Sequence, residues 1–257
     1  MRLENKVAII TGSGSGIGRA TALLFGREGA KVMSMDIIGE TAEATARDIR
    51  DAGGQAHYIQ GDVAIDADVE RMVKTTVERF GRLDVLVNNA GIELVQPITQ
   101  VSKDMLDRLI DVNLKGVWLG CKHAIPQMMK QGGGAIVNTA STAGLRGFPA
   151  FASYSSSKGG VVLLTQTLGV EYARFNIRVN CVCPGLTQTP MLDRQLALMP
   201  DRERVLERMK KGIPMRRIGE AEEVAWGILF LASDEASVLA GVALPMDGGV
   251  CAGDAPW

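Results

Sequence analysis

The chain has 257 residues, of which 46% are hydrophobic and 22% are charged, and its formal net charge is −1. These values fit one globular domain with a sizeable core, and the mixed charges exclude the basic surface that a nucleic-acid partner requires. The first residues are charged, and the chain lacks an apolar run of about 18 residues, so we expect neither a signal peptide nor a membrane-spanning helix. The protein is therefore expected to be cytoplasmic.

Apolar segments of strand length alternate with amphipathic segments of helical length from one end of the chain to the other. The apolar segments predict seven strands, at residues 6–11, 31–36, 56–61, 83–88, 135–140, 178–183 and 242–246. The amphipathic segments predict helices at residues 18–28, 40–52, 67–80, 103–130, 153–174 and 222–232, the fourth with Ser102 as its N-cap. This alternation is typical of parallel βαβ units, and the nearly continuous apolar strands indicate a sheet with helices on both faces.

A glycine-rich turn follows the first predicted strand and leads into a helix. Its glycines are Gly12, Gly16 and Gly18, with Ser15 and Ile17 among them. Glycine lets the backbone turn tightly and approach a pyrophosphate, whose charge the N-terminus of a helix favours. The spacing alone is weak evidence, but a strand before, a helix after and an acidic residue about 20 positions later match a dinucleotide-binding turn.

The acidic residue is Asp36, at the end of the second predicted strand. A carboxylate there can accept hydrogen bonds from both hydroxyls of the adenosine ribose and would repel a 2′-phosphate. The neighbouring positions 13, 15, 37 and 38 supply no cation. The expected cofactor is therefore NAD rather than NADP, although a carboxylate at a strand end can also be only a surface residue.

Tyr154 and Lys158 are four residues apart in a predicted helix, which puts both on one face. A free phenol has a pKa near 10 and is a poor base at pH 7, but a nearby ammonium favours the phenolate. The pair therefore predicts Tyr154 as a general acid/base whose pKa Lys158 lowers. Ser141 follows the fifth predicted strand, at the edge where such sheets bind ligands, so its hydroxyl is expected to hydrogen-bond the substrate oxygen.

Residues 186–214 interrupt the last βαβ crossover and contain prolines at 190, 200 and 214. An insertion of this size is more often a lid or binding loop than a linker, so we expect one domain, residues 1–257, with a substrate lid at about 186–214. Its apolar side chains either close over a hydrophobic or alicyclic substrate or pack a lid helix onto the core. They are Leu186, Met191, Leu192, Leu196, Leu198 and Met199.

These segments together resemble the short-chain dehydrogenase/reductase family over nearly the whole chain. The resemblance is carried by residues 11–18, Asp62 and Val63, residues 88–91, Asn113, Ser141, Tyr154, Lys158, Pro184 and Gly185, and residues 246–249. It implies a single-domain Rossmann-like α/β fold, with a doubly wound sheet of seven parallel strands in the order 3-2-1-4-5-6-7. It also implies a homotetramer formed through the fourth and fifth helices and the C-terminal strand.

The resemblance further implies a role for each motif. Asp62 would bind the adenine amino group with Val63 beside the ring, and Asn113 would position a water and complete a catalytic tetrad. That tetrad is Asn113, Ser141, Tyr154 and Lys158. The cofactor would be contacted by Gly12, Ser15, Gly16, Ile17, Gly18, Asp36, Asp62, Val63, Asn89, Ala90, Gly91, Tyr154, Lys158, Pro184, Gly185, Thr187 and Thr189. Substrate contacts are expected from Ser141, Tyr154, Glu93, Gln188 and Met191, with Glu93 and Gln188 chosen from position alone.

The predicted function is hydride transfer between NAD(H) and a small hydrophobic or alicyclic secondary alcohol or ketone, with Tyr154 as general acid/base. The alternative is a 3-oxoacyl thioester reductase acting on an acyl carrier protein or CoA ester, although Asp36 disfavours the NADPH that biosynthetic enzymes commonly use. A non-catalytic NAD-responsive binding protein is a remote alternative, because a sensor needs no proton relay. The four cysteines form no CxxC pair and lie far in sequence from the two histidines, so no metal site is expected.

Overall fold

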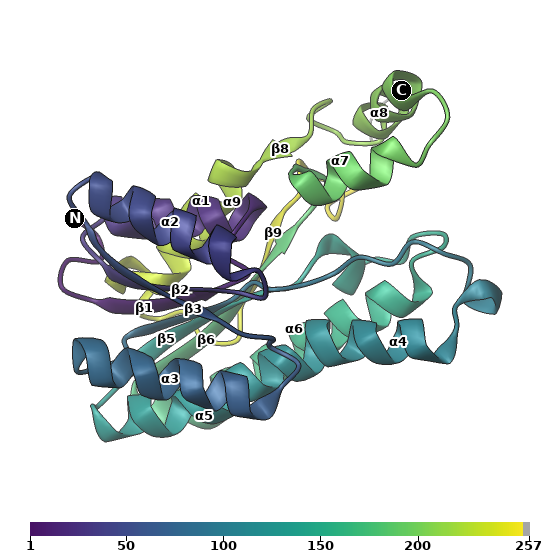
Figure 1. The fold of residues 1–257 in the computed structure, drawn as a ribbon. Helices are drawn as coiled ribbons and strands as arrows, with labels where there is room; N and C mark the ends of the chain where they lie inside the picture. Colours follow the sequence, from purple (N-terminus) through teal and green to yellow (C-terminus); the bar gives the residue numbers. More distant parts are fainter. Residues whose placement is uncertain (254–257) are drawn as a thin grey trace.

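The computed structural model describes residues 1–253 and shows an α/β fold built on one parallel sheet (Figure 1). Within these residues the main sheet has seven strands in the order β3-β2-β1-β4-β5-β6-β9. In chain order they are β1 (Val7–Thr11), β2 (Lys31–Asp36), β3 (Gln55–Gln60), β4 (Val85–Asn88), β5 (Gly134–Thr139), β6 (Ile177–Pro184) and β9 (Ala243–Met246). All neighbouring pairs are parallel. The predicted fold class and strand order are confirmed, with β9 as the seventh predicted strand.

Helices cover both faces of the main sheet (Figure 1). One face carries α1 (Gly16–Arg27), α2 (Gly39–Asp51) and α9 (Ala221–Ala232), and the other carries α3 (Asp66–Phe80), α5 (Gly116–Lys130) and α6 (Ala152–Tyr172). All of β1 is buried because helices meet its side chains on both faces, and each face has its own hydrophobic cluster. Short 3-10 turns lie at Ile98–Gln100, Thr142–Gly144, Ala173–Phe175 and Asp234–Ala236. None of the helices in the described residues is long and apolar enough to cross a membrane.

The helix predicted over residues 103–130 is instead two helices joined by a π-helical segment. Ser102 is the N-cap of α4 (Lys103–Ile110), as predicted, and its side chain accepts a hydrogen bond from the Met105 N–H at 3.2 Å. The π segment Asp111–Lys115 follows, and α5 continues the helix. One wider π-helical turn leaves the apolar pattern of the sequence almost unchanged. The sequence therefore predicts a single helix. Such turns are frequent at functional sites, and this one contains Asn113.

The predicted lid is folded into two helices and a small sheet. β7 (Thr187–Gln188) pairs with β8 (Gly219–Glu220), and α7 (Pro190–Ala197) and α8 (Arg202–Lys211) lie between them in the chain. Figure 1 shows both helices standing over the end of the main sheet. The lid has an apolar cluster of its own, made by Leu192, Leu196, Ile213 and Ile218. Part of the apolar set predicted for the lid therefore packs within the lid itself rather than on the main core.

Arg178 of β6 ties the C-terminal end of α9 to the sheet. Its guanidinium donates to four backbone carbonyls at 2.6 to 3.2 Å, those of Leu231, Ala232, Ser233 and Ala236. The last carbonyls of a helix have no N–H partner within the helix, so Arg178→Met takes the side-chain donor from the carbonyls of Leu231 and Ala232, the last residues of α9. We expect this variant to lose about 2 to 4 kcal/mol of unfolding free energy and roughly 5 to 10 °C of melting temperature.

Differential scanning calorimetry measures this loss. Arg47→Met is the matched control, because Arg47 is an exposed arginine on α2. Equal melting temperatures for the two variants would contradict the role given to Arg178.

Candidate active site

A cavity of about 910 Å³ lies at the carboxyl ends of the strands, with the lid along one side. It is lined by most of the residues that the sequence singles out, namely Gly12, Ser15, Gly16, Ile17, Asp36, Asp62, Val63, Asn89, Ala90, Gly91, Glu93, Ser141, Tyr154, Lys158, Pro184, Gly185, Thr187, Thr189 and Met191. Three others, Gly18, Asn113 and Gln188, are not among the lining residues. The described residues contain no group of three or more His, Cys, Asp or Glu side chains placed to hold a metal.

The glycine turn between β1 and α1 forms one end of the cavity. Gly12 has a φ of +64°, and a Cβ there would lie 2.8 Å from the Cα of Ala90, so only glycine fits. Gly18 does not line the cavity but lets α1 pack on the turn. A Cβ at this position would lie 2.1 Å from the Gly12 carbonyl oxygen, and glycine has none. Ser15 is the N-cap of α1 but makes no side-chain capping bond. The N–H groups of the first helical turn are therefore available to an anion.

Asp36 ends β2 and lines the same end of the cavity. Its Oδ2 accepts a hydrogen bond from the Gly14 N–H at 2.9 Å, and its Oδ1 accepts one from the Ile38 N–H at 3.0 Å. These bonds orient the carboxylate, whose remaining lone pairs can accept from ligand hydroxyls. A close backbone turn, uncapped helix N–H groups and this carboxylate fit the pyrophosphate and ribose of a nicotinamide dinucleotide.

Asp62 is held by protein groups on both of its oxygens. The Ala64 N–H donates to Oδ1 at 2.9 Å, and Nη1 of Arg108 donates to Oδ2 at 2.9 Å. Arg108 comes from α4 and lines the cavity. Arg108 is not predicted from the sequence, because two charges 46 residues apart leave no spacing signal. This wall of the cavity thus carries an ion pair where a lone carboxylate is expected.

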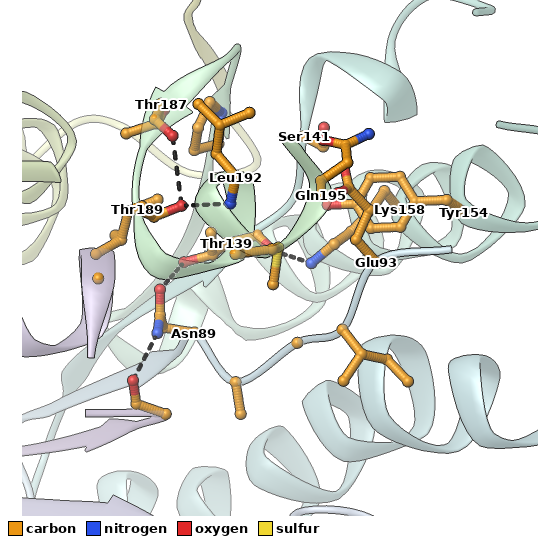
Figure 2. A pocket seen from close by; sticks show the side chains of 18 of the residues that line it. Asn89, Glu93, Thr139, Ser141, Tyr154, Lys158, Thr187, Thr189, Leu192 and Gln195 are labelled. Carbon is orange, nitrogen blue, oxygen red and sulfur yellow. Dashed lines mark hydrogen bonds between the residues drawn. The ribbon is translucent and has the colours of Figure 1, made fainter. Parts of the chain in front are cut away.

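Asn89 fastens the loop after β4 to the glycine turn. Its Nδ2 donates to the carbonyl oxygens of Thr11 at 3.1 Å and Gly12 at 3.3 Å. The N–H groups of Asn89 and Ala90 both donate to Oγ1 of Thr11, at 3.0 and 3.1 Å. This loop is therefore fixed against β1 along the floor of the cavity, as Figure 2 shows for Asn89.

Tyr154 and Lys158 reach the cavity from α6, one helical turn apart (Figure 2). Nζ of Lys158 lies 5.9 Å from the centroid of the Tyr154 ring and donates to the Thr139 carbonyl, at the end of β5, at 2.8 Å. The Ser141 hydroxyl lies near enough to the Tyr154 phenol to act on its pKa, and its Oγ accepts from the Ala143 N–H at 3.1 Å. A hydroxyl, a phenol and an ammonium therefore meet on one wall of the cavity.

The pKa of Tyr154 is raised rather than lowered. Burial is the main cause, the Glu93 carboxylate adds to it, and the hydrogen bond with Ser141 opposes both. Burial also lowers the pKa of Lys158 to about 8. The expectation that Lys158 lowers the pKa of the phenol is wrong for the protein alone. The ammonium of Lys158 lies against the Thr139 carbonyl and over the ring and is not among the groups that shift the pKa of the phenol, so burial of the phenolate prevails.

Asn113 is fully buried in the π segment, behind the cavity wall. Its Oδ1 accepts from the Ile92 N–H at 2.8 Å, and its Nδ2 donates to the Ile92 carbonyl at 2.9 Å and to Oγ of Ser157 at 3.2 Å. A Cβ on Gly91 would lie 3.3 Å from Oδ1 of Asn113 and 3.5 Å from Nζ of Lys158. The side chain of Asn113 thus joins the loop after β4 to α6 at Ser157, the residue before Lys158.

The first residues of the lid touch the glycine turn. Thr189 is the N-cap of α7, accepts from the Leu192 N–H at 3.4 Å and donates to the Thr187 carbonyl at 3.3 Å (Figure 2). A Cβ on Gly16 would lie 3.3 Å from Cγ2 of Thr189. The start of the lid therefore closes the cavity where the phosphate turn and the strand ends meet.

The substrate end of the cavity differs in part from the prediction. Gln188 faces away from the cavity, and its Nε2 donates to Oδ1 of Asp193 at 3.1 Å within the lid. Successive side chains of a strand alternate between its faces, so a strand that turns Thr187 and Thr189 inward turns Gln188 outward. Gln195, seven residues further along the chain in α7, lines the cavity instead.

An aromatic wall completes the substrate end. Phe148 and Phe151 come from the segment before α6 and line the cavity, and the Phe151 ring lies 5.9 Å from the Tyr154 ring in an edge-to-face arrangement. The sequence analysis did not single out either residue. Two phenylalanines, six and three residues before Tyr154, are the signal that could have indicated them.

Three comparisons with known proteins agree with this geometry. Residues 12–251 match the family model described as enoyl-(acyl carrier protein) reductase. An uncharacterized oxidoreductase of Thermotoga maritima is 48% identical over 97% of this chain and 98% of its own length. A 3-oxoacyl-(acyl-carrier-protein) reductase of the same organism is 42% identical over 97% of this chain and 99% of its own. Levodione reductase of Leifsonia aquatica is 40% identical over 96% of this chain and 95% of its own.

Solved structures show the same similarity over the whole chain. A crystal structure of levodione reductase has a TM-score of 0.95 at 39% identity, and the match covers 98% of this chain and 99% of that one. A crystal structure of NAD+-bound xylitol dehydrogenase has a TM-score of 0.93 at 35% identity, with 97% and 100% covered. The likeness therefore includes the lid and the cavity walls as well as the sheet.

Lys158 is expected to make the stability of the protein depend on pH. Burial lowers its pKa to about 8 from the ordinary 10.5, so between these pH values the unfolded chain binds a proton that the folded chain does not. The free energy of unfolding should therefore rise with pH across this interval, by about 3 kcal/mol in total.

Denaturant unfolding at pH values below and above this interval measures the rise. Lys158→Met should lack it, and comparing the two proteins cancels the titration of all other groups. The same pH dependence in wild type and variant would show that the lysine is not held in this way.

Proposed function

Because the chain belongs to the short-chain dehydrogenase/reductase family, we propose that it transfers a hydride between NAD(H) and a secondary alcohol or ketone, with Tyr154 as general acid/base. Its relatives are dehydrogenases and reductases, and the chain is an oxidoreductase of alcohol and ketone groups. One observation carries the proposal. The Ser141 hydroxyl, the Tyr154 phenol and the Lys158 ammonium share a cavity with the glycine turn.

The residues of the chain account for the movement of the proton. In oxidation, Ser141 and Tyr154 hold the alcohol oxygen, and Tyr154 accepts its proton. Ser141 also stabilises negative charge as it develops on that oxygen. When bound, an oxidised nicotinamide supplies the hydride acceptor and a positive charge, which favours the phenolate form of Tyr154. In reduction, Tyr154 returns the proton to the carbonyl oxygen.

Each end of the cofactor has residues that can hold it. The N–H groups of Gly16 and Ile17 begin α1 and can bind the pyrophosphate. Asp36 can accept from both ribose hydroxyls of the adenosine half and would repel a phosphate there, which supports NAD over NADP. Lys158, with a pKa of about 8, is mostly protonated at neutral pH and can donate to the nicotinamide ribose as well as to Thr139.

The second candidate function is reduction of a 3-oxoacyl thioester. The relative that carries this name is 42% identical to the chain, and the apolar lid residues at the cavity can contact an acyl chain. Asp36 weighs against this reading, because it disfavours NADPH. A non-catalytic NAD-binding role is disfavoured further, because the proton-transferring groups are assembled in one cavity.

We also propose a homotetramer that works in the cytoplasm. Large apolar side chains are exposed on the predicted interface helices: Trp118 of α5 is 50% exposed, and Leu163 and Val170 of α6 are 66% and 82% exposed. Exposed apolar patches of this kind mark association surfaces. The cysteines of the chain are free thiols, which is usual in a reducing compartment. The C-terminal tail at 251–257, a further candidate for the interface, lies mostly outside the described residues.

Removing the phenolic oxygen tests the central role of Tyr154. We expect Tyr154→Phe to reduce kcat by about 100-fold or more, because the proton of the substrate loses its acceptor. Binding of NAD+, measured by calorimetry, should change little because the glycine turn and Asp36 are intact. Tyr172→Phe, on the same helix and outside the cavity lining, is the matched control. A Tyr154→Phe enzyme with more than a few per cent of wild-type kcat would refute this role.

Exchanging the carboxylate of Asp36 tests the choice of cofactor. In wild type, kcat/KM with NAD+ should exceed that with NADP+ by about 100-fold, from hydrogen bonds to a charged group and from repulsion of the 2′-phosphate. Asp36→Ser should bring the two values close together, chiefly by lowering the value for NAD+. Asp51→Ser, at the exposed end of α2, should leave the ratio unchanged. Wild-type activity with NADP+ equal to that with NAD+ would contradict the assignment.

A further inference from the structure

Glu93 brings a carboxylate to the substrate end of the cavity. It lies on the loop after β4 and lines the cavity, and its charge acts on the Tyr154 phenol. Figure 2 shows Glu93 in one group with Lys158, Tyr154, Ser141 and Gln195, all of which line the cavity. The carboxylate is therefore next to the groups that handle the reacting oxygen.

Within residues 1–253, no hydrogen bond or ion pair from the protein reaches the Glu93 carboxylate. Burial raises the pKa of Glu93, and no neighbouring cation opposes this rise. The cations that line the same cavity are engaged or placed elsewhere: Lys158 donates to Thr139, Arg108 pairs with Asp62, and Arg194 is exposed on α7. A half-buried carboxylate without a donor is costly, so a donor on the substrate is the partner that this site lacks.

The side chains around Glu93 indicate the chemistry of the rest of the substrate. Apolar side chains line this end of the cavity from two sides, Phe148 and Phe151 before α6 and Met191 and Met199 from the lid. Gln195 adds one neutral amide from α7, on the Ser141 side (Figure 2). An apolar enclosure with a few placed polar groups orients a small molecule through those groups. A substrate that fits this end of the cavity has an apolar carbon skeleton and more than one polar functional group.

We propose that Glu93 is a specificity-determining residue that accepts a hydrogen bond from a second hydroxyl of the substrate, on the carbon next to the one oxidised. The substrate class is then neutral vicinal diols, or hydroxy ketones in the reverse direction. In the oxidation, the carbinol carbon gives its hydride to NAD+ and the carbinol oxygen gives its proton to Tyr154. The second hydroxyl is retained, so a diol yields a hydroxy ketone. This inference rests on the proposed function and names its substrate class.

Steady-state kinetics on matched substrate pairs test the inference. The pairs share a carbon skeleton and differ in the second hydroxyl: cyclohexane-1,2-diol against cyclohexanol, and butane-2,3-diol against butan-2-ol. In wild type, kcat/KM for each diol should exceed that for its mono-alcohol by about 10- to 100-fold, the range for a hydrogen bond to a charged group. In Glu93→Leu the ratio, taken at a pH where both rates have reached their maximum, should fall to near unity, because only the diol loses a hydrogen bond. Glu93→Gln keeps one acceptor oxygen and should retain an intermediate ratio.

Two further readouts separate recognition from a structural role. Calorimetric binding of cyclohexane-1,2-diol to NAD+-loaded Tyr154→Phe enzyme should be lost when Glu93→Leu is added. In Glu93→Gln, the pH at which cyclohexanol oxidation reaches half its maximum should move down, because the charge of Glu93 raises the pKa of Tyr154 while Lys158 and Arg194 are unchanged. Glu70→Gln, on the exposed side of α3, is the matched control and should leave every readout at its wild-type value.

The outcomes distinguish this inference from the function on which it rests. Equal kcat/KM for diol and mono-alcohol in wild type, or parallel losses on both in Glu93→Leu, would overturn the role of Glu93 and leave the proposed function standing. Absence of NAD+-dependent oxidation of all four alcohols would count against the proposed function itself, and the inference would fall with it.

Discussion

The burial of one lysine is the constraint on which the site depends. Lys158 is 3% exposed, and this burial lowers its pKa to about 8. Its ammonium donates to the Thr139 carbonyl in place of water. This bond fixes the register between β5 and α6, because the acceptor ends the strand and the donor lies near the start of the helix. Gly144 allows the close approach, since a Cβ there would lie 2.7 Å from the Lys158 carbonyl oxygen. The positions of Tyr154 and Ser141 follow from this packing.

The strand order then determines where the cofactor half of the cavity can lie. β1 and β4 are neighbours in the sheet although β2 and β3 lie between them in the chain, and the loops after them leave toward opposite faces. Sheets of this topology bind ligands in the crevice that results. Asn89 spans the crevice with hydrogen bonds to the carbonyls of Thr11 and Gly12. The crevice is thus held by polar contacts, and apolar packing is left to the two faces of the sheet.

Local patterns made most of the fold and half of the site predictable. Strands that are buried on both faces appear in the sequence as apolar runs. Tyr154 and Lys158 are one helical turn apart, so the spacing alone places both side chains on one face of the helix. Gln188 was misplaced and Gln195 missed because the lid changes from strand to helix within a few residues, and the direction of each side chain depends on where that change occurs. Arg108 and the direction of the Tyr154 pKa shift depend on contacts between distant segments and on burial, which no spacing encodes.

The lid and the loop that carries Glu93 differ in how tightly they are tied to α6. The lid packs around its own apolar cluster, so its contacts with substrate can change without moving α6. Glu93 is different, because the residue before it, Ile92, is bonded through both backbone groups to the Asn113 side chain, which also donates to Ser157 on α6. Ser157 precedes Lys158 in the chain. One buried amide therefore links the loop that carries Glu93 to the helix that carries Tyr154 and Lys158, which accounts for an asparagine in a π segment that does not line the cavity.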